Sequence, residues 1–130
     1  MHLELNDFQD TANALDSGTL GNDGAIAGAT YVADSADGST GSLEFDASDQ
    51  VDLGAFDVDG SGLTVAAWIN ADSFPGNARD PRIVSKASGG AADDHVFMLS
   101  TVTSGGANTA LRARVRVAGC LLYTSDAADE

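Results

Sequence analysis

The chain has 130 residues, with 6 Lys and Arg against 20 Asp and Glu, so its formal net charge is −14. Such an acidic surface repels phosphate backbones, which argues against nucleic acid as a partner. No apolar run approaches the ~20 residues of a membrane-spanning helix, which argues against membrane insertion.

Nearly all of the acids are Asp, the exceptions being Glu4, Glu44 and Glu130. Asp has poor helix propensity and is favoured in turns, where its short side chain bonds to the nearby backbone. The acids therefore mark loops between short apolar segments. This pattern predicts an all-β protein, and a spacing of roughly 8–12 residues between segments is typical of a sandwich or jelly roll.

The first half of the chain contains five short candidate strands. Turns rich in Gly and Asp separate them, because Gly supplies the positive φ that tight turns need. We expect these segments to pair in an antiparallel β-sandwich. They lie at Leu3–Leu5, Ala25–Ala27, Thr30–Ala33, Ser42–Phe45 and Val51–Leu53.

The stretch Leu63–Asn70 is nearly continuous in apolar residues. In an extended backbone Leu63, Val65 and Ile69 share one face, and Trp68 lies on the other. A strand that is apolar on both faces is typical of a sheet covered on two sides. We therefore expect a buried central strand here.

Three further strands are expected, at Arg82–Lys86, Val96–Thr101 and Ala110–Val117. The last alternates without exception, with apolar residues on one face and Arg on the other. Such a period of two predicts a half-buried antiparallel strand. His95 has no metal-type partner nearby in the sequence, and we expect it at a solvent-facing loop end.

Residues 120–130, Cys-Leu-Leu-Tyr-Thr-Ser-Asp-Ala-Ala-Asp-Glu, resemble the translation of a transposon mosaic-end sequencing adapter. We therefore expect the domain to occupy residues 1–119 and residues 120–130 to be a non-native tail. The tail holds the only cysteine, so no disulfide or thiolate site is expected. Without further native strands, Ala110–Val117 is expected to form an exposed sheet edge.

The order of the segments over residues 3–117 resembles the laminin-G-like, concanavalin A-like jelly-roll domains of bacterial surface proteins. The resemblance implies an antiparallel β-sandwich that is truncated at its C-terminal end. The matching stretches include Asp16-Ser17-Gly18, Leu43-Glu44-Phe45-Asp46, Val51-Asp52-Leu53, Leu63–Ile69 and Ile83-Val84-Ser85-Lys86.

This resemblance also implies a function. The chain is expected to be a non-catalytic carbohydrate-binding or adhesion module of a larger secreted or cell-surface bacterial protein. Its expected partners are a glycan or cell-surface polysaccharide and the other domains of the parent chain. Calcium is common in the family, so Ca²⁺ is the expected cofactor.

Two features are candidate ligand-binding residues. Trp68 could stack on the apolar face of a sugar ring, the alternative being a core position beside Phe45 and Phe97. Arg112, Arg114 and Arg116 could bind carboxylated or sulfated glycans through bidentate contacts. The alternative for the arginines is a solvated face paired with acids on the neighbouring strand.

Four acids are candidate calcium ligands: Asp16 and Asp23 around one Gly turn, and Asp57 and Asp59 before another. Calcium takes six to eight oxygens, and alternate loop residues can converge on it. The alternative is that these acids only stabilise Asp-Gly turns.

Two other functions stay open. The chain could be the N-terminal part of a jelly-roll glycoside hydrolase, which would need paired carboxylates on a strand. Before residue 120, Glu44 with Asp46 on its own face is the nearest approach to such a pair. The chain could also be a structural spacer in an adhesin, with no ligand of its own.

Overall fold

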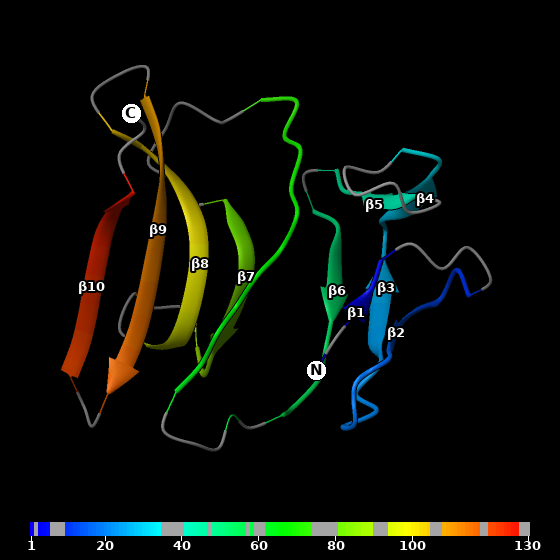
Figure 1. Cartoon of the computed structure of the whole chain (residues 1–130), viewed down its shortest axis with the longest axis horizontal. Coiled ribbons are helices and arrows are strands. Elements are labelled where there is room, and N and C mark those ends of the chain that lie inside the picture. Colours follow the sequence, from blue (N-terminus) through cyan, green and yellow to red (C-terminus); the bar gives the residue numbers. More distant parts are fainter. Residues whose placement is uncertain are drawn as a thin grey trace. The chain divides into compact units, whose positions relative to one another are not determined.

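The computed structural model is built from antiparallel strands, and no helix occurs among the residues it describes (Figure 1). This confirms the all-β prediction. The chain divides into two compact units, Met1–Thr64 and Val65–Glu130. None of the described segments is a helix long and apolar enough to cross a membrane. The structure describes residues 1, 3–5, 10–34, 41–46, 48–56, 58, 62–73, 81–89, 94–104, 108–117 and 120–127.

The N-terminal unit contains a four-stranded sheet and a two-stranded sheet. The larger sheet has the order β1-β2-β3-β6, and the smaller sheet pairs β4 with β5. Every strand of these two sheets except β2 overlaps a segment that the sequence predicted to be a strand. The strands are β1 (Leu3–Glu4), β2 (Asn13–Asp16), β3 (Gly24–Ala27), β4 (Thr30–Val32), β5 (Ser42–Glu44) and β6 (Gln50–Asp52).

Strand β2 was not predicted because an acid occupies one of its inward positions. Ala14 and Asp16 are buried, while Asn13 and Leu15 are half-buried. The usual pattern places apolar residues at alternate inward positions. Here Asp16 replaces one of them, and its carboxylate is satisfied by backbone N–H groups of the following loop.

Asp10 fixes the turn that leads into β2. Its Oδ1 accepts the backbone N–H groups of Ala12 at 2.8 Å and Asn13 at 3.1 Å. Its Oδ2 accepts the side-chain Nδ2 of Asn13 at 3.0 Å. The side-chain hydrogen bond from Asn13, followed by the backbone hydrogen bond from Ala12, lowers the pKa of Asp10 below its ordinary value of 3.8.

This lowered pKa predicts an acid-sensitive contribution to stability. The contribution is present above the unfolded pKa and is lost as pH falls through the lower, folded pKa. We expect the melting temperature of the Asp10→Asn variant to fall less than that of the wild type when the pH drops below 3.8, the ordinary pKa of Asp. Thermal melts from pH 2 to pH 6 measure this effect, with the exposed Asp34 changed to Asn as the control. The prediction would be contradicted if the melting temperatures of the wild type and of Asp10→Asn fell equally as the pH is lowered.

The C-terminal unit contains one four-stranded sheet with the order β10-β9-β8-β7. Its strands are consecutive in the chain, so the sheet is a meander with all neighbours antiparallel. Register shifts interrupt β7 near both of its ends. The strands are β7 (Arg82–Ala87), β8 (His95–Ser104), β9 (Asn108–Val117) and β10 (Cys120–Ala127).

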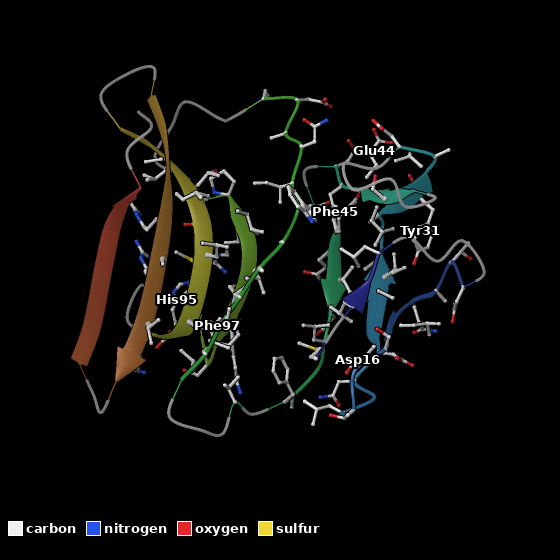
Figure 2. The ribbon with its side chains drawn as sticks, in the orientation of Figure 1. Asp16, Tyr31, Glu44, Phe45, His95 and Phe97 are labelled. Carbon is white, nitrogen blue, oxygen red and sulfur yellow. The ribbon has the colours of Figure 1, made fainter. Side chains whose placement is uncertain are left out.

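Strand β8 supplies most of the buried side chains of this unit. Phe97, Met98, Ser100 and Thr101 are all buried. His95 is also buried, so the expectation of a solvent-facing loop end was wrong. The reason is that β8 begins at His95, one residue earlier than predicted, and pairs it with Ala87 of β7. Figure 2 shows His95 and Phe97 on this strand.

The prediction of a buried strand at Leu63–Asn70 was wrong. Residues 62–73 are not part of any β-strand in the structure, and every one of them is exposed. An apolar run forms a covered strand only where neighbouring strands supply the cover. This run instead contains the boundary between the two units, at Thr64 and Val65.

Residues of the expected tail pair with β9 as the strand β10. The register runs from Cys120 opposite Val117 to Ala127 opposite Leu111. The outer strand of the sheet is therefore β10 rather than β9, which corrects the expectation that Ala110–Val117 forms the edge. The adapter-like origin of residues 120–130 stays a prediction from the sequence.

Candidate functional site

The three arginines of β9 share one face of the sheet with Arg82 of β7. Residues directly opposite one another on paired strands lie on the same face. Ser100 of β8 is opposite both Arg82 and Arg112, and Met98 is opposite Arg114. We call the side of the sheet that carries Arg82, Arg112, Arg114 and Arg116 the arginine face.

The arginine face gathers four of the six Lys and Arg residues of a chain whose net charge is −14. Arg112 and Arg114 are half-buried, whereas Arg82 and Arg116 are exposed. A partly buried guanidinium keeps its donors fixed while its aliphatic stem covers apolar surface. This arrangement gives a local positive field and a set of bidentate hydrogen-bond donors.

No acid stands directly opposite these arginines in the described register. Arg112 and Arg114 face Ser100 and Met98 on β8. On β10 the opposite positions of Arg112, Arg114 and Arg116 are Ser125, Tyr123 and Leu121. The directly opposite positions on β8 and β10 therefore carry no acid in the described register, and the solvated-face alternative stays open.

Ser100 occupies the middle of the row that joins Arg82 to Arg112. Its side chain is 0% exposed, and its Oγ has no hydrogen-bond partner. An unpaired hydroxyl in a buried position costs about 1–3 kcal/mol. Such a group in a native fold calls for a functional or structural explanation.

The opposite face of the same sheet is apolar. Phe97, Leu99 and Val115 lie on it, with Val84 of β7 opposite Leu99. Phe97 is buried, whereas Val115 is 42% exposed. The two faces of the sheet therefore differ in character: the arginine face carries four cations, whereas the described part of the apolar face carries Lys86 opposite Phe97.

Trp68 does not occupy a core position. Its side chain is 81% exposed, so the alternative that it packs beside Phe45 and Phe97 was wrong. Phe45 is itself 46% exposed. Trp68 lies in residues 62–73, which pair with no strand, and its side chain is open to solvent.

Asp16 and Asp23 are brought together, but around the backbone of their own loop. Asp16 Oδ1 accepts the N–H of Gly18 at 2.9 Å, and Oδ2 accepts the N–H of Asn22 at 3.0 Å. Asp23 Oδ1 accepts the N–H of Asp16 at 2.8 Å. Figure 2 shows Asp16 at the end of β2, where this loop begins.

These contacts do not make up a calcium shell. Two carboxylates that already serve backbone donors fall short of the six to eight oxygens that Ca²⁺ takes. Among the residues that the structure describes, no group of three His, Cys, Asp or Glu side chains is placed to hold a metal ion. Asp57 and Asp59 lie outside the described residues. Calcium binding therefore stays a prediction from the sequence.

Sequence reasoning missed two members of the arginine face, Arg82 and Ser100. A single cation at the start of a strand does not reveal which strand will lie opposite it. Their alignment with Arg112 depends on a register that includes the shift between Arg82 and Val84. Comparisons with protein families, curated proteins and solved structures find no match to this chain.

Proposed function

We propose that this chain is a non-catalytic carbohydrate-binding module, built as a laminin-G-like β-sandwich and belonging to a secreted or cell-surface protein. Its ligand is an acidic glycan, bound on the arginine face. The observation that carries the proposal is the concentration of four arginines on one sheet face.

The chemistry of the face favours an extended anionic polymer. Guanidinium groups bind carboxylate and sulfate through paired hydrogen bonds. Arg112, Arg114 and Arg116 repeat at every second residue of an extended strand, so their Cα atoms lie about 6.5–7 Å apart. A flexible polysaccharide with regularly spaced charges can contact several of them at once, which raises its overall affinity.

Trp68 supplies a second kind of contact. An exposed indole offers a large apolar surface and an N–H donor, which suits the mixed apolar and polar faces of a sugar ring. A singly exposed Trp needs no special explanation by itself. Its role in this proposal is therefore tested separately from that of the arginines.

A glycan array with neutral, carboxylated and sulfated glycans tests the proposal. We expect signals on the acidic glycans that weaken as salt is raised, because ionic contacts are screened. Parallel arrays with Ca²⁺ and with EDTA show whether calcium takes part. No signal on any glycan in either condition would contradict the proposal and favour the structural spacer.

Trp68→Ala separates the aromatic contribution from the ionic one. We expect this change to lower glycan affinity by about tenfold, equivalent to about 1.4 kcal/mol. Leu20→Ala is the matched control, since Leu20 is also a large exposed apolar residue, 61% exposed, and belongs to the N-terminal unit. Equal losses in both variants would remove Trp68 from the binding surface. A parallel assay for new reducing ends tests the hydrolase alternative.

A further inference from the structure

The row Arg82–Ser100–Arg112 differs from the rest of the arginine face. It crosses three strands, with Ser100 of β8 opposite Arg82 of β7 on one side and Arg112 of β9 on the other. Neighbouring strands lie about 4.8 Å apart, so the Cα atoms of the two arginines are separated by about 10 Å. Two long side chains can converge from that separation on a group above the central strand.

The central hydroxyl gives this row a feature that a plain cationic patch lacks. Ser100 is 0% exposed and its Oγ has no hydrogen-bond partner. A serine hydroxyl is both a donor and an acceptor, and a buried one is normally satisfied. An oxyanion held between the two guanidinium groups would accept the Ser100 O–H and remove this deficit.

We propose that the row Arg82–Ser100–Arg112 is a binding site for a sulfate ester of an acidic glycan, an inference that rests on the proposed glycan-binding function. A sulfate ester has three terminal oxygens, and the row provides three donor groups: two guanidinium forks and one hydroxyl. Arg82 is exposed, so its guanidinium can meet an anion that arrives from solvent.

The test measures the affinity of the full chain for dextran sulfate, with alginate as the carboxylated probe and dextran as the neutral one. We expect Arg82→Gln and Arg112→Gln each to weaken dextran sulfate binding by about tenfold. Lys86→Gln is the charge-matched control, because Lys86 lies opposite Phe97 on the apolar face. We expect that control to change the affinity by less than twofold.

Ser100→Ala separates an effect of the hydroxyl on binding from an effect on stability. This change removes a buried hydroxyl without a partner, so the melting temperature is expected to stay the same or rise. Binding of dextran sulfate is nevertheless expected to fall several-fold. A variant that binds as tightly as the wild type would overturn the role of the hydroxyl.

The outcomes separate this inference from the function on which it rests. If Lys86→Gln weakens binding as much as Arg82→Gln, attraction is non-specific and the site is overturned. If alginate binds more tightly than dextran sulfate, the assignment to sulfate is overturned while glycan binding stands. If none of the three polysaccharides binds, the proposed function itself fails.

Discussion

Replacing Gly28 by alanine is expected to destabilise the N-terminal unit by about 2–4 kcal/mol, through two additive effects. Gly28 has a φ of +89°, a backbone conformation that L-residues with a Cβ rarely adopt. A Cβ at this position would also collide with Oδ1 and Cγ of Asp49.

Asp49 is not free to retreat from that collision. Its Oδ2 accepts the N–H of Asp46 at 2.8 Å, and its own N–H donates to the carbonyl of Asp46 at 2.8 Å. Moving the side chain away would break the first of these bonds. The steric part of the cost is therefore expected to be close to that of the lost hydrogen bond, about 0.5–1.5 kcal/mol.

Gly21→Ala is the matched control for the backbone effect. Gly21 has a φ of +61°, but nothing lies within 4 Å of a Cβ added there. We expect this variant to lose only about 1–2 kcal/mol. Urea unfolding monitored by circular dichroism measures both variants. Equal losses at Gly21 and Gly28 would show that the contact with Asp49 is not as close as the structure has it.

Deleting residues 120–130 is expected to have the second large effect. The deletion removes β10, which pairs with seven residues of β9. Each backbone hydrogen bond contributes about 1 kcal/mol net, so the C-terminal unit should lose several kcal/mol. Strand β9 would then become an unpaired edge, with Leu111 44% exposed and Val115 42% exposed on its apolar face. Such an edge favours pairing between chains.

Light scattering and thermal melts of the truncated chain measure this effect. A chain whose residues 120–130 are shuffled is the control, since it keeps the length and charge but not the strand pattern. We expect the truncated chain to self-associate more and to melt at a lower temperature. Truncation that leaves both the melting temperature and the monomeric state unchanged would show that the adapter-like residues contribute nothing to the fold.

The sequence predicted strands well where a short alternating pattern is bounded by Gly and Asp turns. That pattern identified the segments that become β1 and β3 to β9, because alternation follows directly from strand geometry. It missed β2, since the inward Asp16 is satisfied by loop N–H groups that no local pattern reveals. It also mistook Leu63–Asn70 for a buried strand, because hydrophobicity alone does not specify a partner strand.

The candidate site was predicted only in part, for a similar reason. The alternation of Ala110–Val117 placed Arg112, Arg114 and Arg116 on one face, as the register confirms. Arg82 and Ser100 joined them only through pairing between strands that are distant in sequence. Register depends on bulges and turn lengths, which the composition of a single strand does not contain.

Chemical-shift mapping of the ¹⁵N-labelled chain, titrated with a sulfated polysaccharide, tests the arginine face most directly. The account predicts that the largest changes fall on the amides around Arg82, Ser100 and Arg112, on the neighbouring strands β7, β8 and β9 of the C-terminal sheet. These changes should reverse when salt is added. Changes confined to residues of the N-terminal unit, or no changes at all, would contradict it.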